Sequence, residues 1–413
     1  MVTLLRRLFA TQIGAPSKAT PVVFVSMFSP AFCAAGAATP LDPLDTYVVG
    51  SGFKSKGYMI LPHTYIATLL VVFFSMLCWG SWANTQKMTG KWRFELFYYD
   101  YAFGVLLTAL ICAFTLGSLG YDGFSFLDDM MNGGKRYAAM GFGAGIVFNL
   151  ANMLLVAAIA VAGLAVAFPV GIGLALIIGV IWNYMIRPQG NAMLLFVGCA
   201  LVVGAIIVDA IAYRAMEQFR AELLAQAGKA KSTRKKVSLK GVFLSLASGV
   251  LMGSFYPLVV MSKSSEWGGT AGENGLGPYA IGVVFALGVF FSTFIFNLFF
   301  MNLPVEGDPL EFLDYFKGRP KQHILGVIGG IIWCGGTIAN FAASSAPEAV
   351  QVGPAISLAL GQGAAMVSAL WGLFVWKEFE GADSRIKALL LIMFFLFIAG
   401  LTMVSVAPLY APQ

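Results

Sequence analysis

Long stretches without a charged residue dominate the chain from residue 57 to its end. These charge-free windows cover 57–86, 101–121, 137–186, 188–208, 241–262, 274–305, 322–347, 349–376 and 388–413. A helix that crosses a bilayer needs about 20 largely apolar residues, so most windows hold one crossing. The third window is long enough only for two helices joined by a tight turn near Ala160 to Gly163. The pattern therefore predicts an all-α polytopic membrane protein with ten transmembrane helices.

The windows also place the ten crossings along the chain. We expect helix centres near Phe73, Leu110, Phe148, Leu174, Leu201, Leu251, Gly288, Ile332, Ala364 and Phe395. Composition supports the membrane assignment, because 59% of the 413 residues are hydrophobic and only 11% are charged. That leaves too little polar surface to cover a water-soluble protein of this size.

Basic residues are distributed unevenly between the two sets of loops. The loops after spans 1, 5, 7 and 9 hold 17 Lys and Arg, against six on the other side when Lys54 and Lys56 are included. Cytoplasmic loops accumulate Lys and Arg, so both chain ends are expected outside the cytoplasm, in a bacterial inner (plasma) membrane. The net charge of +6 fits this orientation and lipid contact better than nucleic-acid binding.

The expected organisation has four parts: an N-terminal extension 1–58, a first five-helix repeat 59–212, a basic cytoplasmic loop 213–240 and a second five-helix repeat 241–413. The extension holds an apolar run from Pro21 to Ala38 that ends in small residues, as in a secretory signal. A disordered segment, a membrane-associated segment and a true start at Met59 are the alternatives. The five cysteines are far apart, and their spacing favours neither a disulfide framework nor a metal site.

The two halves of the chain are weakly similar. Gly145 to Val166 aligns without gaps with Gly329 to Val350, and each segment is followed by a proline and then Leu-Ala-Leu. These pairs are Pro169 with Leu174-Ala175-Leu176, and Pro354 with Leu358-Ala359-Leu360; the span openings Gly80-Ser81-Trp82 and Gly253-Ser254-Phe255 also match. Because five is odd, the two repeats would have opposite orientations in the membrane. Inverted repeats with a midplane solute site are typical of secondary transporters. Chance similarity between Gly- and Ala-rich helices is the alternative.

Several motifs resemble the ureide permease family. They are Cys78-Trp79-Gly80-Ser81-Trp82-Ala83-Asn84, Lys91-Trp92-Arg93-Phe94-Glu95-Leu96, Tyr99-Asp100-Tyr101, Asn149-Leu150-Ala151-Asn152 and Phe168-Pro169-Val170-Gly171. The resemblance extends to the bacterial glucose/ribose porter and rhamnose transporter families of the drug/metabolite transporter superfamily. It implies ten helices in inverted five-helix repeats, with outside termini and a large cytoplasmic central loop. Plant ureide permeases carry a nucleotide-loop-like motif there, whereas Gly228 to Thr233 lacks the required spacing. We therefore expect no nucleotide and no other cofactor.

Polar and aromatic residues at bilayer depth are the candidates for solute binding, because an unpaired polar group there is costly and usually faces the bundle interior. We select Trp79, Trp82, Asn84, Asn149, Asn152, Tyr256, Trp333, Asn340 and Gln362, with Asn297, Gln351 and Ser357 as further polar groups. Amides and aromatic rings suit a neutral solute with hydroxyl or amide groups. The alternative is that the amides join helices and the tryptophans lie at the interface.

Three acids near the membrane are candidates for ion coupling: Asp100, Asp209 and Glu348. A partly buried carboxyl can exchange a proton near neutral pH. Each of the three is also close to a helix end, where a solvated or capping acid is the ordinary interpretation. The apolar part of span 1, Leu69 to Trp82, contains no carboxylate, and this argues against export of lipophilic cations.

The leading hypothesis is a secondary transporter that moves a small uncharged polar metabolite by alternating access. Sugar is the first candidate, and ureide or nucleobase is the second. The alternatives are a multidrug or metabolite exporter of the same superfamily, a membrane enzyme and a non-transporting receptor. An enzyme is disfavoured because HExxH and GxSxG are absent and the only histidines are His63 and His323. The expected partners are a small-molecule solute and membrane lipid. Coupling to a proton is left open.

Topology is directly testable. We expect residues 213–240 to face the cytoplasm and the C-terminal residues Tyr410 to Gln413 to lie outside it. A reporter that fluoresces only in the cytoplasm, fused after Gln413, should therefore stay dark. A bright fusion would show that the span count or the orientation is wrong.

Overall fold

All ten predicted crossings are present as helices in the computed structural model, which describes residues 58–226, 239–263, 274–304 and 308–410. The crossings are α3–α4 (Tyr65–Ser81 and Ala83–Met88), α5 (Phe94–Phe114), α7 (Lys135–Ala162), α8 (Leu164–Ile186), α9 (Ala192–Gln226), α10 (Leu239–Lys263), α11 (Pro278–Asn302), α12 (Pro320–Ala343), α13–α14 (Pro354–Gly361 and Ala364–Leu370) and α15 (Ser384–Val406). Each predicted centre falls inside its helix, so the ten-helix, all-α prediction is confirmed. The signal-like run lies outside the described residues.

Short elements connect some of the spans. They are α6 (Phe126–Asn132), the 3-10 helix η1 (Phe312–Lys317), the π-helical turn η2 (Trp371–Val375) that ends span 9, and η3 (Ala407–Tyr410) after α15. The connection between spans 3 and 4 is the single residue Gly163, whose φ of 81° is a conformation that L side chains rarely adopt. The tight turn expected at Ala160 to Gly163 is therefore confirmed.

Span 5 is longer than its charge pattern suggests. The helix α9 continues to Gln226, inside the segment that the sequence assigns to the basic loop. Residues 213–226 contain neither Gly nor Pro and are rich in Ala, Leu, Met, Glu and Arg, which are good helix formers. Charge ends the apolar stretch without ending the helix, so the polar connection begins with a helical extension of span 5.

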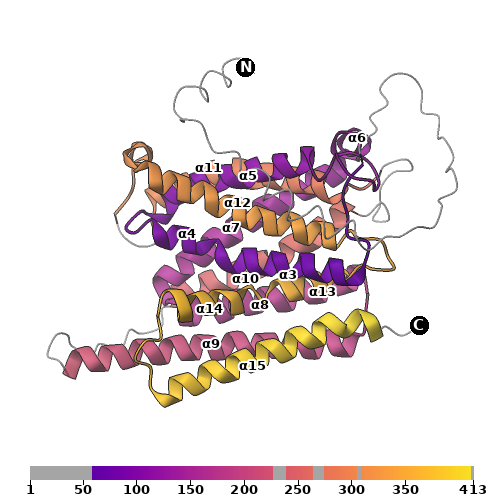
Figure 1. Cartoon of the computed structure of the whole chain (residues 1–413). Helices are drawn as coiled ribbons and strands as arrows, with labels where there is room; N and C mark the ends of the chain where they lie inside the picture. The colour runs from indigo at the N-terminus through magenta and orange to yellow at the C-terminus, as the bar shows by residue number, and fades with distance from the viewer. Residues whose placement is uncertain (1–57, 227–238, 264–273, 305–307, 411–413) are drawn as a thin grey trace, which may run out of the picture. The chain divides into compact units, whose positions relative to one another are not determined.

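Two buried hydrophobic clusters divide the helices between them. One cluster is formed mainly by α5, α7, α10, α11 and α12, and the other by α3, α8, α9, α13, α14 and α15. Figure 1 shows α9 and α15 side by side along one edge, and α5, α11 and α12 near the opposite edge. Each cluster contains helices from both halves of the chain, so neither half has a separate core.

Helix contacts pair up in the way an inverted repeat requires. In such a repeat span 1 corresponds to span 6, span 2 to span 7, and so on, and each contact should have a counterpart between the corresponding spans. Span 2 contacts span 8, and the corresponding spans 7 and 3 are also in contact. The same correspondence relates the contacts of spans 6 and 3 to 1 and 8, and of spans 6 and 4 to 1 and 9. The pairs 2 with 7, 4 with 9, and 5 with 10 map onto themselves. The arrangement is thus compatible with the predicted repeat.

The two aligned prolines have different positions in their helices. Pro169 lies inside α8, whereas Pro354 is the first residue of α13.

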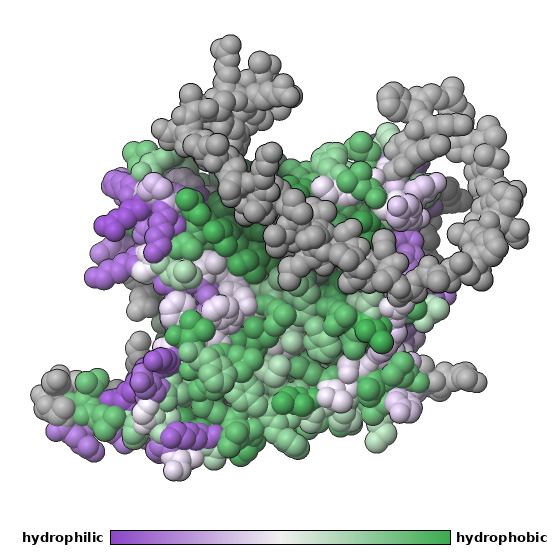
Figure 2. Space-filling model, viewed as in Figure 1, coloured by the Kyte–Doolittle hydropathy of each residue, from purple (hydrophilic) through white to green (hydrophobic). Residues whose placement is uncertain are grey.

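The outer face of the bundle is apolar. Figure 2 shows hydrophobic residues over much of the visible face, with hydrophilic residues concentrated at one end of the helices. Large side chains such as Leu391 and Phe395 on α15 are each 71% exposed. Water would oppose such exposure, whereas a lipid environment accommodates it. The surface therefore agrees with ten membrane-spanning helices.

Close backbone approach joins α7 to α11. A Cβ at Gly145 would lie 2.1 Å from the carbonyl oxygen of Phe285, and a Cβ at Gly288 would lie 2.1 Å from that of Phe142. Backbone cannot yield as a flexible side chain does, so both positions require glycine. Such small residues at helix contacts are common in membranes.

We expect Gly145→Ala to lower the unfolding temperature in detergent, because overpacking costs about 1–3 kcal/mol. Gly143, on the same helix, is the matched control, since a Cβ there meets nothing within 4 Å. Gly143→Ala should be neutral or slightly stabilising, because alanine favours the helix. Equal unfolding temperatures for the two variants would contradict the close packing of α7 and α11.

Candidate functional site

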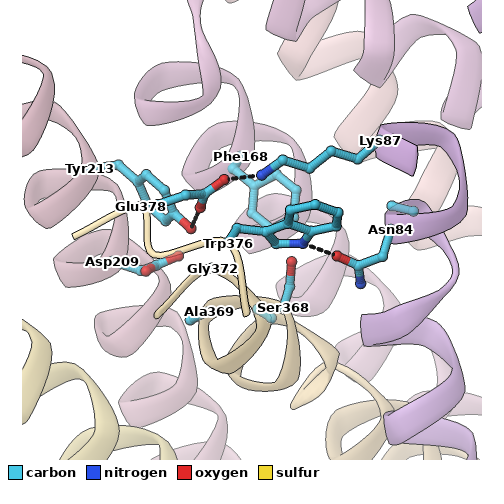
Figure 3. A pocket seen from close by; sticks show the side chains of 12 residues that line it. Asn84, Lys87, Phe168, Asp209, Tyr213, Ser368, Ala369, Gly372, Trp376 and Glu378 are labelled. Carbon is cyan, nitrogen blue, oxygen red and sulfur yellow. Dashed lines mark hydrogen bonds and ion pairs between the residues drawn. The ribbon is translucent and has the colours of Figure 1, made fainter. Parts of the chain in front are cut away.

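A cavity of about 200 Å³ lies among spans 1, 4, 5 and 9 (Figure 3). Spans 1, 4 and 5 belong to the first half of the chain and span 9 to the second. The cavity is lined by Ala83, Asn84 and Lys87 of α4, Phe168 of α8, Asp209 and Tyr213 of α9, Ala365, Ser368 and Ala369 of α14, Gly372 of η2, and Trp376 and Glu378 after it. Its wall therefore combines small residues, aromatic rings and charged groups from both halves.

Glu378 joins the two halves at this cavity. Its carboxylate forms an ion pair with Lys87 and accepts a hydrogen bond from the Tyr213 hydroxyl at 2.8 Å (Figure 3). Its backbone carbonyl accepts a hydrogen bond from the Arg220 guanidinium at 2.6 Å. A Cβ at Gly372 would lie 2.6 Å from both the Glu378 carboxylate and the Tyr213 hydroxyl, so the absence of a side chain there makes room for this network.

A second contact between the halves involves Trp376. Its indole nitrogen donates a hydrogen bond to the Asn84 side-chain oxygen at 2.5 Å, and the Lys87 ammonium lies 4.5 Å from the centre of its ring. The Asn84 amide nitrogen donates to the Ser81 carbonyl at 2.9 Å. The end of span 1 is thus held against the segment that follows span 9.

Asp209 differs from the other charged residues of the cavity. It is 6% exposed, and no described residue donates a hydrogen bond to its carboxylate; its Oδ1 atom is fully buried. A buried polar group without a partner is costly, and it calls for a ligand, water or ion.

Spans 1 and 9 contact each other between the cavity and the middle of span 1. Trp79, Ala83 and Lys87 are four residues apart on span 1 and share one face. The Trp79 ring packs against Gly361 of span 9, while a Cβ at Gly80 would lie 2.5 Å from the Ala364 carbonyl oxygen. The two spans therefore lie in close contact from the Trp79 level towards the cavity.

A polar cluster lies deeper, where spans 6, 8 and 9 meet. The Tyr256 hydroxyl donates to the Asn340 side-chain oxygen at 2.5 Å, and the Ser357 hydroxyl donates to the same oxygen at 3.2 Å. All three residues are fully buried. Nearby, the Trp79 indole nitrogen donates to the Thr337 hydroxyl at 3.0 Å. The structure therefore brings together Trp79, Tyr256 and Asn340 of the predicted candidates.

The remaining predicted residues have varied surroundings. Trp333 stacks on Phe148 at 4.4 Å between ring centres, and Trp82 lies 4.9 Å from the ring of Tyr101. The Asn152 amide donates to the Tyr98 hydroxyl at 3.0 Å. Gln362 is the half-buried residue that ends α13.

Asn149 contacts a neighbouring helix. Its amide nitrogen has three acceptors on α11: the Val289 carbonyl at 3.2 Å, the Ser292 hydroxyl at 2.8 Å and the Thr293 hydroxyl at 3.1 Å. This geometry joins α7 to α11 and does not place the amide at the polar cluster or in the cavity lining.

The other two candidate acids also differ in environment. Asp100 is 5% exposed and accepts hydrogen bonds from the Tyr315 hydroxyl at 2.5 Å and the His323 Nδ1 at 2.8 Å. Burial, and then the Asp100 carboxylate, raise the pKa of Tyr315, so its hydroxyl stays a donor. Glu348 is exposed in the segment between α12 and α13. Asp100 is thus held in a polar cluster, whereas Glu348 is solvated.

Sequence reasoning missed most of the cavity. Lys87 entered only as a loop charge, and Tyr213, Trp376 and Glu378 were not selected, because they lie at or beyond the ends of the apolar windows. Ser368 lies inside the window 349–376 and was not selected either. The π-helical turn η2 ends span 9, and Lys377, with a φ of 51°, follows it between Trp376 and Glu378. The sequence does not reveal this turn. Within the described ranges, no group of three or more His, Cys, Asp or Glu could hold a metal ion.

The fold and this site define an integral membrane protein of ten helices with a polar cavity between spans of its two halves. The sequence model of the ureide permease family matches residues 97–240 and 214–407. The chain therefore belongs to the ureide permease family, as its motifs predicted.

Curated relatives come from a plant. Ureide permease 1 of Arabidopsis thaliana is 23% identical over 380 residues, covering 80% of this chain and 94% of the relative. Ureide permease 4 of the same organism is 24% identical over 415 residues, covering 86% and 97%. Ureide permease 2 is 22% identical over 391 residues, covering 81% and 94%. The similarity thus extends over nearly the whole length of these relatives, while the bacterial location stays a prediction.

Proposed function

We propose that this protein is a secondary membrane transporter of a small, uncharged polar metabolite. The observation that carries the proposal is the cavity between the two halves, whose lining includes charged, polar and aromatic side chains, together with the buried Tyr256–Asn340–Ser357 cluster. Solute sites in transporters with repeated halves lie between those halves. A cavity of about 200 Å³ is smaller than typical drug sites, which favours a small metabolite.

A ureide is now the first candidate for the solute. The family and the relatives bear the name ureide permease, which favours the class that the sequence analysis placed second to sugar. Ureides carry several N–H donors and carbonyl acceptors on a compact frame. The carboxylates, hydroxyls and amides of the cavity and the central cluster complement such groups.

Alternating access is proposed as the mechanism, because the two ends of the bundle differ. The end without the cavity is held by hydrogen bonds between helices and helix ends of the two halves. The Ser262 hydroxyl donates to the Tyr137 carbonyl at 2.7 Å, the Asn191 amide to the Ala407 carbonyl at 2.8 Å, and the Gly277 amide to Asp129 at 2.8 Å. At the cavity end, Lys87–Glu378 and Asn84–Trp376 are the contacts that would break on opening. Under the predicted topology this is the cytoplasmic end.

Asp100 is proposed as the coupling site if uptake is driven by protons. Its carboxylate, the His323 imidazole and the Tyr315 hydroxyl are joined by hydrogen bonds, and such a chain can hold and pass a proton. Glu348 is exposed and lacks a comparable environment.

The test is uptake of radiolabelled ureide, nucleobase and sugar into proteoliposomes, with and without an imposed pH gradient. We expect ureide uptake to exceed sugar uptake. If the gradient stimulates it, Asp100→Asn should lose the stimulation and keep gradient-independent uptake, while Glu348→Gln should retain both. Preference for sugar would overturn the ureide assignment. Absence of uptake for the whole panel would overturn the transport proposal.

Replacement of interior amides separates solute contact from helix packing. We expect Asn340→Leu to fold in detergent and to lose solute binding, because a site built on hydrogen bonds discriminates strongly against their loss. Asn152, which the sequence analysis also selected, donates to Tyr98 of α5, so Asn152→Leu should keep solute binding. Asn149→Leu is the matched control, since the Asn149 amide bonds only to α11. It should cost on the order of 0.6 kcal/mol of stability and keep its affinity for solute.

Binding affinity and unfolding temperature should be measured on the same detergent preparations. If Asn340→Leu binds solute as the unmodified protein does, or fails to fold, the Asn340 amide joins helices as Asn149 does. The solute-binding residues would then be confined to the cavity lining.

A further inference from the structure

The hydrogen bonds at the cavity leave one buried carboxylate free. Lys87, Tyr213 and Glu378 bond to one another, and Asn84 bonds to Trp376. Ser368, whose hydroxyl points towards the cavity, is exposed (Figure 3). Asp209 is the residue of this lining that is both buried and without a hydrogen-bond donor among the described residues. Its carboxylate is therefore the polar group of the cavity most in need of a donor from outside the protein.

The required ligand group is an N–H donor. A carboxylate has only acceptor sites and forms its strongest hydrogen bonds in pairs with two parallel N–H groups. An open-chain ureido group, –NH–CO–NH₂, presents two such N–H groups side by side, on the face opposite its carbonyl oxygen. A single hydroxyl or a single ring N–H offers no matching pair of N–H groups. The geometry of the ureido group therefore complements a free carboxylate.

The ammonium of the cavity lining is already paired with a carboxylate other than Asp209. The Lys87 ammonium belongs to the same lining as Asp209, and its partner is the Glu378 carboxylate. Lys87 therefore makes no hydrogen bond to Asp209, whose carboxylate is left for a ligand. The small volume likewise leaves room for a compact ligand only.

We propose that Asp209 binds the paired N–H groups of a ureido solute in this cavity. This rests on the proposed transport function and assigns Asp209 a role in solute recognition, where the sequence suggested ion coupling. The Trp376 ring and Phe168 form the aromatic part of the wall beside it. Asn84 holds the Trp376 indole through a hydrogen bond, and Tyr213 is bonded to Glu378.

The first measurement is equilibrium binding of 5-ureidohydantoin to the full-length protein in detergent. We expect Asp209→Asn to weaken binding at least tenfold, because the amide supplies one acceptor and one mismatched donor in place of two acceptors. Glu348→Gln is the control: it also replaces a carboxyl by an amide, but Glu348 is exposed and lies outside the cavity lining. The control should bind 5-ureidohydantoin with unchanged affinity.

The second measurement changes the ligand. A 5-ureidohydantoin derivative whose ureido N–H groups carry methyl groups should bind the unmodified protein at least tenfold more weakly than the parent compound. Asp209→Asn should bind the two compounds with similar, weak affinity. Tighter binding of the isosteric cation 5-guanidinohydantoin than of 5-ureidohydantoin would overturn the proposal and make the cavity a cation site.

A third measurement locates the ligand if Asp209→Asn fails to fold. Ala83 is exposed and lines the cavity, so Ala83→Cys should react with a maleimide, and 5-ureidohydantoin should slow this reaction while the methylated derivative does not. Ser384→Cys, exposed at the start of α15 and outside the lining, should react equally with and without ligand.

These outcomes separate the two proposals. If the unmodified protein binds and transports no ureide, the proposed substrate class fails. The role of Asp209 is wrong, while the transport function stands, if the unmodified protein binds 5-ureidohydantoin and the methylated derivative equally well. The same holds if Asp209→Asn folds and still binds 5-ureidohydantoin more tightly than the methylated derivative. Absence of ligand protection at Ala83→Cys would likewise place the bound ureide outside this cavity.

Discussion

The structure depends on the need to pair every polar side chain inside a bilayer, where water cannot do so. Most buried hydroxyls and amides meet this need within or between helices. Thr108 donates to the Gly104 carbonyl of its own helix, and Ser248 to the Ala151 carbonyl of α7. The Asn297 amide donates to the Glu95 carbonyl of α5. Nine buried side-chain atoms of the described residues lack a partner, and of these the Asp209 Oδ1 is the one that belongs to the cavity lining.

The same constraint decides what could be predicted from sequence. Charged residues are excluded from the apolar core, so their positions along the chain marked all ten crossings. The positive φ of Gly163 allows the short turn expected between spans 3 and 4. The end of α9 was missed, because charge marks the end of an apolar stretch and not the end of a helix.

The site was only partly predictable for a different reason. Sequence gives the depth of a polar residue but not the direction in which its helix is rotated. Asn149 and Asn340 have similar depth and related positions in the two halves, yet Asn149 bonds to α11 and Asn340 to Tyr256 and Ser357. Asn84 and Asp209 were identified by depth and do line the cavity. Trp376 and Glu378 follow span 9 and reach the cavity through a turn with no clear sequence signature.

The account makes the cavity around Asp209 the solute site of the conformation described. A cryo-electron microscopy structure of the full chain in nanodiscs with 5-ureidohydantoin tests this most directly. The account predicts ligand density in the cavity of spans 1, 4, 5 and 9, with the two ureido nitrogens within hydrogen-bonding distance of the Asp209 oxygens. Ligand density at the Tyr256–Asn340–Ser357 cluster or elsewhere, with Asp209 left free, would contradict it.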